Sequence, residues 1–585
     1  MDIAAEKRLD LIAIGYLLLA TFVAHFLLVK HFGLYEDDYL LVAAPMVSEW
    51  HNILDYITSN FTHWYQGRPL GLSVITIFAF FGSKAGGLLV IYFLGYAVIA
   101  TNVCLTYIIL RKFVERFAAL SGALIFCLYP ADTTKILLTH SLILQFAWTC
   151  SLAAALAYLN NRTKLFFALS CLPLITYESV FLPLLALPMT RMEFSRNYLK
   201  HYAKYGGGLL LIVCAYALIR IVFFSERRLV NVSHLNPLDL VEAVFSAVIM
   251  GPILSASTFF IRPATALMQG NFYSWVFIIS FFTLTLAALY FLGHNRADTQ
   301  ADTSARLPIG ASGVKDWFRS ALQGNLADPV RLIATGLVMW PISYLLAFTH
   351  WPPSGLNGRA NSSVHMAGHL SACLLVAGLL SLLLASKWVA SGNRPTRLSL
   401  IAVLASYLSL LAGFSFIVQQ DFAESWARQK SFWRQVISLT PDMHEHSLIF
   451  VPQNSLNNTH PTYIQTRSWG NSITLYYIYP FPDAFKEATP RVIFVDKELL
   501  SSVKKENGVW VWSTPRFTGG SIQTVSEKID LTNAIFLGLR KSDGKLRRLT
   551  GPVKLMKGLK IFVPDIGPAN NYPKTPVYDL IMDRD

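Results

Sequence analysis

Residues 11–29 read LIAIGYLLLATFVAHFLLV, an apolar run that contains no Asp, Glu, Lys or Arg. A helix of this length can span the hydrocarbon core of a bilayer, which is ~30 Å thick. Lys7 and Arg8 precede the run, Lys30 and His31 end it, and no small-residue cleavage site is present. The pattern predicts a retained first transmembrane helix rather than a signal peptide.

Further apolar runs follow along the chain, so the sequence predicts about 11 membrane spans in total. After the first run they lie at 85–110, 117–130, 136–159, 165–177, 179–190, 207–224, 272–292, 332–348, 367–386 and 398–418. Several are short, which is typical of helices that tilt, break or line a cavity.

The composition of the whole chain agrees with a membrane protein. Of 585 residues, 54% are hydrophobic and 14% are charged, whereas soluble proteins carry roughly 25% charged residues. Too few charges remain to cover a soluble surface of this size, which argues against a soluble enzyme and against a disordered chain. All six cysteines lie in apolar stretches without metal-ligand or disulfide spacing, so we interpret them as small buried hydrophobes.

The net charge of +14 is distributed unevenly between the loops. If the N-terminus is cytoplasmic, the inside loops hold most of the basic residues, as the positive-inside rule requires. These include Arg111, Lys112, Arg116, Arg191, Arg196, Arg296, Arg306, Lys387, Arg394 and Arg397. We therefore expect a multi-pass protein of the inner (plasma) membrane with no nucleic-acid partner. An odd number of spans places everything after residue 420 outside, in the periplasm.

Two apolar stretches fit this map less simply. Arg68–Phe81 is short and follows a Gly-Arg-Pro turn, so it is expected either to lie along the outer surface or to cross. Leu238–Ile261 contains Asp239 and Glu242 and is broken by Gly251-Pro252. We expect an outer re-entrant or interfacial segment there, because a full crossing would invert every later loop.

The chain changes character after the last apolar run. Residues 421–439 are predicted to form an interfacial amphipathic helix that places Trp426 and Trp433 near the membrane surface. Residues 440–585 are predicted to form a smaller soluble domain, either α/β or mostly β, in which we find no catalytic motif. Its expected strands are Ser447–Pro452, Ile473–Tyr479, Arg491–Asp496, Val509–Ser513, Ala534–Leu539 and Lys560–Pro564.

The first outer loop opens with three consecutive carboxylates, Glu36, Asp37 and Asp38. Three such charges beside a membrane are unfavourable unless a cation, a role as a base or a hydrogen-bond network offsets them. Neighbouring side chains point in different directions, so only two of the three are expected to share one site. The alternative interpretation is a solvated loop start or a helix cap.

Other polar residues fall on the same predicted side of the membrane. Tyr177 and Glu178 lie at a turn between two short apolar runs, and Arg68 ends the first loop. The later candidates that border outer loops are Asp132, Lys135, His140, Arg359, His365 and His369. The four-residue spacing of the last two lacks a third ligand, so no zinc site is expected. Arg and Lys suit a phosphate group, and a carboxylate suits a general base on a hydroxyl.

Several short motifs resemble those of one enzyme group. Tyr35-Glu36-Asp37-Asp38-Tyr39, followed by Gly67-Arg68-Pro69-Leu70, resembles the first-loop signature of GT-C-type integral-membrane glycosyltransferases. Leu128-Tyr129-Pro130 and the segment 177–183 are similar to later outer-loop elements of that group. The segment 426–433 is similar to the junction before the extracytoplasmic C-terminal domain of bacterial members. The resemblance covers residues 1–190, and the rest of the chain matches only in topology, as a GT-C-like membrane domain of residues 1–420.

The resemblance implies transfer of a sugar from a polyprenyl-phosphate donor to a glycan, lipid or protein acceptor on the outer face, with inversion. The acidic first-loop role would fall on Asp37 or Asp38, with Glu36 as the alternative, and Glu178 would be the second carboxylate. Substrate contacts would come from Arg68, Lys135, Tyr177, Arg359 and His365. No cofactor is expected, and because some members need a divalent metal and others do not, metal dependence stays open.

Two other functions compete with this one. A transporter or polysaccharide-handling protein should show repeated halves and charges near mid-membrane, whereas here no repeat is found and the carboxylates cluster at the outer edge. An inactive relative that serves as an accessory subunit would retain the topology alone. The C-terminal domain could bind an acceptor glycan, contact a partner or cap the membrane domain.

Overall fold

The computed structural model describes most of the chain and forms the basis of all that follows. It describes residues 3–193, 196–223, 236–294, 327–346, 363–385 and 394–444. In the C-terminal part it describes 447–452, 474–479, 490–495, 501, 503–506, 509–518, 521–528, 534–556, 559–563 and 565–583.

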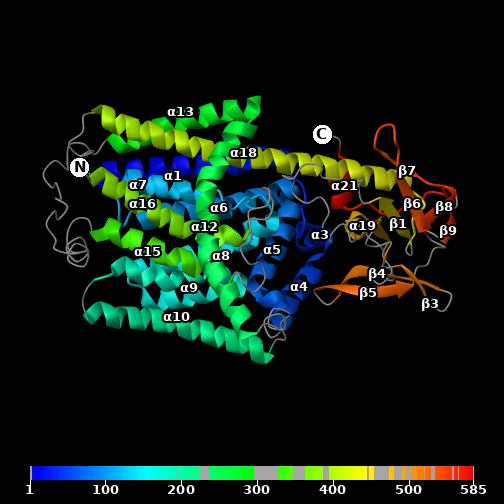
Figure 1. The fold of residues 1–585 in the computed structure, drawn as a ribbon, viewed down its shortest axis with the longest axis horizontal. Helices are drawn as coiled ribbons and strands as arrows, with labels where there is room; N and C mark the ends of the chain where they lie inside the picture. The colour runs from blue at the N-terminus through cyan, green and yellow to red at the C-terminus, as the bar shows by residue number, and fades with distance from the viewer. Residues whose placement is uncertain are drawn as a thin grey trace.

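Helices make up the first three quarters of the chain and pack as one bundle (Figure 1). The long ones are α1 (Ile3–Phe26), α5 (Pro69–Gly86), α6 (Leu88–Leu110), α8 (Gln145–Leu159), α10 (Arg196–Phe223), α12 (Pro237–Gln269), α13 (Phe272–His294), α15 (Ala327–Ser343), α16 (His369–Ala385) and α18 (Arg394–Leu439). Shorter helices are α2 (Asp38–Leu41), α3 (Ala43–Val47), α4 (Trp50–His63), α7 (Arg116–Cys127) and α9 (Thr163–Thr176). Single turns and irregular helices are η1 (Val29–His31), η2 (Tyr65–Gly67), η3 (His140–Leu144), η4 (Glu178–Val180), η5 (Leu182–Arg191) and η7 (Ser363–Gly368).

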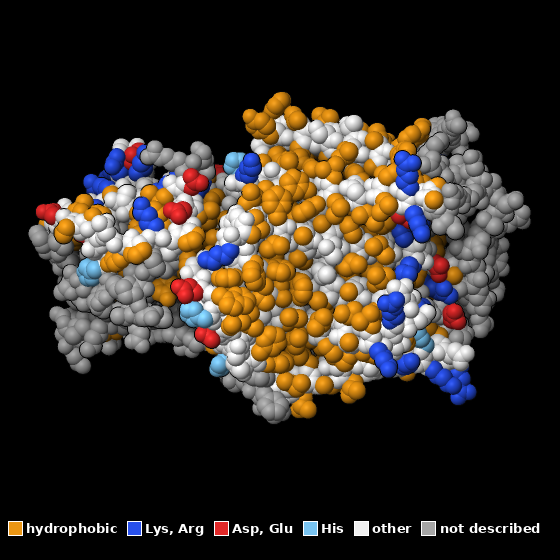
Figure 2. Space-filling model, turned by 180° about the vertical axis from the view of Figure 1, so that it is seen from behind, with side chains coloured by type: hydrophobic (Ala, Val, Ile, Leu, Met, Phe, Trp, Pro, Cys, Tyr) orange, Lys and Arg blue, Asp and Glu red, His pale blue; other side chains and the backbone are white. Residues whose placement is uncertain are grey.

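Nine helices within the described residues are long and apolar enough to cross a membrane. Leu, Ile, Val and Phe side chains cover both the interior and the outer face of the bundle, so these helices are apolar all round. Figure 2 shows this outer face as a broad field of hydrophobic side chains, with Lys and Arg gathered along the edge farthest from the C-terminal part.

The nine candidate spans differ in part from the runs expected from the sequence. They include α5 and α12, the two stretches for which a surface location was considered. The expected runs at 117–130 and 165–177 are the shorter helices α7 and α9, and the run at 179–190 is largely the 3-10 helix η5. Pro183 and Pro188 in η5 prevent the regular backbone hydrogen bonds of an α-helix. In Figure 1, α12 runs across α1, α13 and α15 rather than alongside them.

The last membrane run and the predicted interfacial helix form one continuous helix, α18, of 46 residues (Figure 1). The second half of α18 is not a separate helix, and it packs on the segment that contains the three carboxylates. Trp426 and Trp433 are 3% and 0% exposed, so they are core residues and not surface anchors. The prediction of an apolar face after residue 420 is therefore correct, but this face packs against other parts of the protein and not against lipid.

The C-terminal part contains a small mixed sheet. Strand β1 (Leu448–Pro452) is central and pairs in parallel with β2 (Arg491–Val495) and β6 (Ala534–Leu539), and β6 pairs antiparallel with β7 (Leu546–Arg548). Two further antiparallel sheets are formed by β3 (Lys504–Glu506), β4 (Val509–Thr518) and β5 (Ser521–Lys528), and by β8 (Gly551–Met556) and β9 (Leu559–Val563). Phe450 stacks on Phe536 with ring centroids 4.6 Å apart, and Trp512 packs beside Phe450.

One strand prediction in this region is wrong. The segment Ile473–Tyr479 was expected to be a strand, but Thr474–Ile478 is the short helix α19. Thr474, Leu475, Tyr477 and Ile478 are its buried residues, and this spacing places them on one face of a helix. The β-branched and aromatic residues that favoured a strand are explained instead by burial.

The C-terminal part is attached to the end of α18 and to the first outer loop. Arg548 on β7 forms an ion pair with Asp442 just after α18 and also donates to the carbonyl of Leu439 at 3.3 Å. Arg434 on α18 donates to the carbonyl of Ile581 in the last helix, α21 (Pro576–Met582), at 2.7 Å. Helix α21 in turn packs against α3 of the first loop.

Candidate functional site

The carboxylate of Asp38 is completely buried at the start of α2. It accepts hydrogen bonds from the backbone N–H groups of Tyr35 at 3.3 Å, Leu138 at 3.3 Å and Thr139 at 2.8 Å. The hydroxyl of Thr139 donates a further bond at 2.6 Å. Asp38 therefore ties the first outer loop to a segment 100 residues later in the chain.

The three carboxylates occupy different environments. Burial raises the pKa of Asp38 to about 7, while its hydrogen bonds act in the opposite direction. Burial, with the negative charges of Asp37 and Asp38, raises the pKa of Glu36 to about 8. Glu36 also has a left-handed backbone with φ of 46°, which is costly for a residue other than glycine and recurs at functional sites. Asp37 lies between them at the N-cap of α2 and is partly exposed.

The second half of α18 packs against this acidic turn. The hydroxyl of Tyr35 donates to the carbonyl of Phe422 at 2.8 Å, and that of Tyr39 donates to Gln429 at 2.8 Å. Gly33 lies so close to the ring of Trp426 that a Cβ atom at this position would overlap it. The backbone of the turn is therefore fixed on both sides of the three carboxylates.

Arg68 and Glu178 form an ion pair although they lie 110 residues apart in the chain. Nε of Arg68 lies 3.2 Å from Oε2 of Glu178 and Nη2 lies 3.3 Å from Oε1, which is bidentate geometry. The guanidinium also stacks on the ring of Tyr177 at 4.0 Å. Burial would lower the pKa of Arg68, but Glu178 and Tyr177 together raise it above its ordinary value, so this residue stays charged.

The acidic turn and this ion pair meet around the start of α5. The segment Leu138–Thr139, which binds Asp38, runs directly into η3. At Gly71, three residues after Arg68, an added Cβ atom would lie 2.7 Å from Ile143 of η3 and 2.8 Å from the carbonyl of Thr176. Because Thr176 immediately precedes Tyr177 and Glu178, four segments of the chain converge in this region.

A second guanidinium lies beside the ion pair. Tyr216 on α10 donates to the carbonyl of Gly67 at 2.9 Å, and Arg220 donates to the Tyr216 hydroxyl at 2.9 Å. Gly67 has a left-handed φ of 67°, and Arg220 occupies the space that a side chain at this position would need. The sequence analysis missed Arg220, although a charged residue at the end of an apolar helix is itself a signal of function.

Other predicted site residues lie elsewhere. Nζ of Lys135 donates to the carbonyls of Cys127 at 2.5 Å and Phe126 at 3.4 Å, at the end of α7. The nearby Asp132 carboxylate lies 3.3 Å from His369, and Asp132 and Lys135 line a cavity of about 10 Å³. His365 is 2% exposed and bonds to the Tyr344 hydroxyl at 2.9 Å. Arg359 lies outside the described residues.

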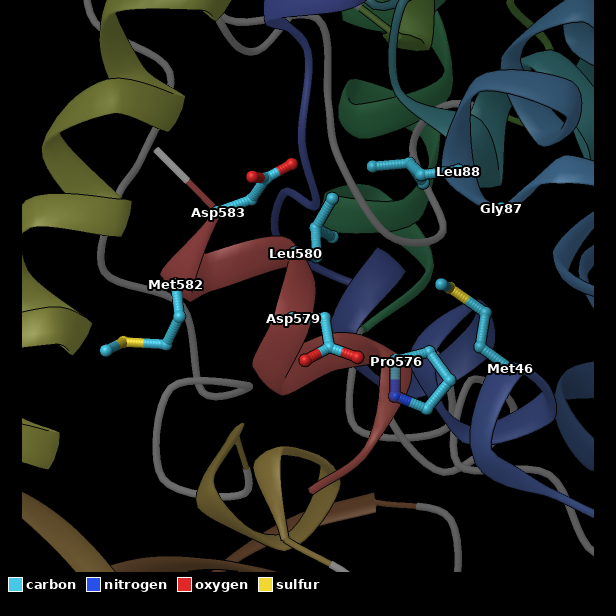
Figure 3. A pocket seen from close by; sticks show the side chains of 8 residues that line it. All are labelled: Met46, Gly87, Leu88, Pro576, Asp579, Leu580, Met582 and Asp583. Atoms are coloured by element: carbon cyan, nitrogen blue, oxygen red, sulfur yellow. The ribbon is translucent and has the colours of Figure 1, made fainter. Parts of the chain in front are cut away.

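A larger hollow separates the first loop from the C-terminal helix (Figure 3). It has a volume of about 400 Å³, and Met46, Gly87 and Leu88 line one side. Pro576, Asp579, Leu580, Met582 and Asp583 of the C-terminal segment line the other. This hollow is therefore open space between the two parts of the molecule, beside the loop that carries the three carboxylates.

Within the described part of the chain, no three His, Cys, Asp or Glu side chains are grouped in a way that could hold a metal ion. No protein-family model and no curated protein matches the chain. The site therefore has to be interpreted from its own geometry. That geometry brings together Asp38, Arg68, His140, Tyr177 and Glu178 from the residues considered in the sequence, and adds Thr139 and Arg220.

Proposed function

We propose that this chain is a GT-C-type membrane glycosyltransferase that uses a polyprenyl-phosphate sugar as donor. The nine apolar helices and the apolar field with a basic edge support a polytopic membrane protein with its C-terminal part outside. The basic edge would face the cytoplasm of the cell, across the inner membrane from the acidic turn. The transfer would then occur at the outer face.

The proposed general base is Asp37. Asp38 is unsuitable because its carboxylate is sealed and already accepts four hydrogen bonds. Glu36 is a weaker candidate, because burial and the neighbouring charges raise its pKa to about 8 and reduce its ionised fraction at neutral pH. Asp37 is partly exposed and is fixed in place by its neighbour, so it meets the geometric requirement for a base.

Arg68 would bind the phosphate that leaves with the lipid. Glu178 uses only the Nε and Nη2 edge of the guanidinium, so Nη1 remains available to donate to a phosphate oxygen. Glu178 and Tyr177 then act on the orientation of Arg68 rather than on the sugar. Lys135 and His365, which lie in the buried interior, have no direct role in this proposal.

The reaction is a displacement at the anomeric carbon. A hydroxyl oxygen of the glycan, lipid or protein acceptor forms a bond to this carbon as the bond from the carbon to the phosphate oxygen breaks. Asp37 takes the hydroxyl proton, and the polyprenyl phosphate leaves with the electron pair beside Arg68. Attack from the side opposite the phosphate inverts the anomeric configuration.

One observation carries the proposal: Asp38 joins the acidic turn to Leu138 and Thr139, and the η3 turn that follows them packs on α5, directly after Arg68 of the Arg68–Glu178 pair. The test is release of polyprenyl phosphate from a panel of polyprenyl-phosphate sugars by the purified full chain in lipid vesicles, with cell-envelope extract as the source of acceptor. We expect Asp37→Asn to lower the rate at least 100-fold, in the range of general-base catalysis. An unchanged rate in this variant, or no release from any donor by the wild type, would contradict it.

A further inference from the structure

The chain departs from regular helix geometry at His140. The residues His140–Leu144 form η3, a π-helical turn at the beginning of α8. Such turns are rare, and they occur frequently at functional sites because the wider turn moves a side chain out of its regular position. The turn follows directly on Leu138 and Thr139, the two residues whose backbone N–H groups bind Asp38.

The imidazole of His140 contains a polar atom without a partner. Its Nδ1 atom is fully buried and makes no hydrogen bond to any described residue. A buried polar atom without a partner is destabilising, and each case in a folded protein needs an explanation such as a ligand or an ordered water. The residue as a whole is partly exposed.

His140 lies between the two halves of the candidate site. On one side, Thr139 donates to Asp38. On the other side, η3 packs on the beginning of α5, and His140 lies within electrostatic range of the Arg68 guanidinium. An imidazole N–H beside a guanidinium is a combination of donors that suits an anionic oxygen.

We propose that His140 is a substrate-binding residue whose imidazole donates a hydrogen bond to a phosphate oxygen of the lipid donor, next to Arg68. This role rests on the proposed function, because it assumes a phosphate-bearing ligand. It differs from the roles of Thr139 and Glu178, which act on other side chains. A phosphate oxygen would accept the hydrogen bond that the His140 imidazole does not make to any described residue.

The test is binding of undecaprenyl phosphate to the full chain in detergent, which requires no turnover. We expect His140→Phe, which keeps a ring but no donor, to weaken binding about tenfold. At least one of His140→Asn and His140→Gln, which keep an amide donor, should bind within threefold of the wild type. His51→Phe is the matched control, because His51 is exposed and lies in α4, a different segment from His140.

Three results would overturn this role. In the first, His140→Phe binds within twofold of wild type while Asp37→Asn abolishes donor turnover. This result would show that His140 does not bind the phosphate, and it would leave the proposed function intact. Equal loss in all three His140 variants, with a lowered unfolding temperature, shows a structural role only. Absence of binding by the wild type contradicts both proposals.

Discussion

At the scale of single residues, the three adjacent carboxylates divide into different roles because their surroundings differ. Asp38 is buried and accepts four hydrogen bonds, whereas Glu36 and Asp37 are both partly exposed and only Glu36 has a raised pKa in a left-handed backbone. The sequence predicted that they could not all share one site. It left the choice of base open, because Leu138 and Thr139 lie 100 or more residues away.

The hydrogen bond from the Thr139 hydroxyl to Asp38 is expected to stabilise the folded protein. Thr139→Val removes the 2.6 Å bond to Asp38 and leaves a buried carboxylate with fewer donors. We expect a loss of about 1–2 kcal/mol in the free energy of unfolding, since bonds to charged groups are stronger than average. Thr139→Ser keeps the hydroxyl and should stay within about 0.5 kcal/mol of wild type. Thermal unfolding in detergent measures both, and equal values for Val and Ser would show that the bond contributes nothing.

The acidic turn also predicts a pH dependence. Because the pKa of Glu36 is raised from 4.5 to about 8 in the folded protein, the folded state binds this proton more tightly than the unfolded chain does. The associated stability is complete below the ordinary pKa and is lost as the pH rises toward 8. We expect the unfolding temperature of the wild type to fall over this range, and Glu36→Gln to reduce the fall by about 2 °C. Parallel curves for the two proteins would contradict the raised pKa.

At the scale of elements, α18 is the part that connects the acidic turn to the rest of the chain. Its outer half contacts Gly33, Tyr35 and Tyr39 and continues to Arg434 and Asp442, which hold the C-terminal part. The sequence predicted an amphipathic segment after residue 420 from its apolar face. It could not show whether lipid or protein covers that face, because both are apolar environments.

The close contact between Gly33 and Trp426 is expected to exclude any larger residue at position 33. Gly33→Ala places a methyl group into the indole ring, so the loop or α18 must move. We expect a loss of about 1–3 kcal/mol, as for other overpacked cores. Trp426→Ala alone should be destabilising as well, but the double variant should be more stable than the sum of the two losses by at least about 1 kcal/mol. Strict additivity in unfolding experiments would mean that the two residues are not in contact.

The sequence predicted some elements well and others poorly, for physical reasons. The long apolar runs at α1, α6, α13 and α16 are helices, because their length and composition leave no alternative in an apolar setting. Residues 473–479 were assigned to a strand because β-branched and aromatic residues favour strands, whereas their burial follows a helical period. The Arg68–Glu178 pair could not be predicted, although both residues were candidates, since the pairing depends on how distant helices pack.

At the scale of the whole molecule, the C-terminal part shares one hydrophobic core with the helical part and is also joined to it by polar contacts. Arg548 and Asp442 form the main one, with side chains that are 4% and 14% exposed. Helix α21 and the first loop enclose the hollow shown in Figure 3. This hollow is open space beside the segment that carries the three carboxylates.

The ion pair between Arg548 and Asp442 is expected to hold the C-terminal part against the helical part. Arg548→Gln leaves Asp442 without its guanidinium, and loss of one partner of a buried pair costs about 3–5 kcal/mol. We expect the C-terminal part to become sensitive to limited proteolysis, while the helical part keeps its unfolding temperature. Arg540→Gln is the control, because Arg540 pairs with Asp543 at an exposed site. Equal protease resistance in wild type, Arg548→Gln and Arg540→Gln would show that other contacts hold this part in place.

The central claim is that the outer acidic turn and the Arg68–Glu178 pair transfer sugar from a lipid phosphate. The most direct measurement is incorporation of labelled sugar from a polyprenyl-phosphate donor into acceptor, by wild type, Asp37→Asn, Asp38→Asn and Glu178→Gln, with the exposed Asp55→Asn as control. We expect a loss of at least 100-fold in Asp37→Asn, losses in Asp38→Asn and Glu178→Gln through misplaced groups, and wild-type activity in Asp55→Asn. Full activity in the first three variants would contradict the proposed site.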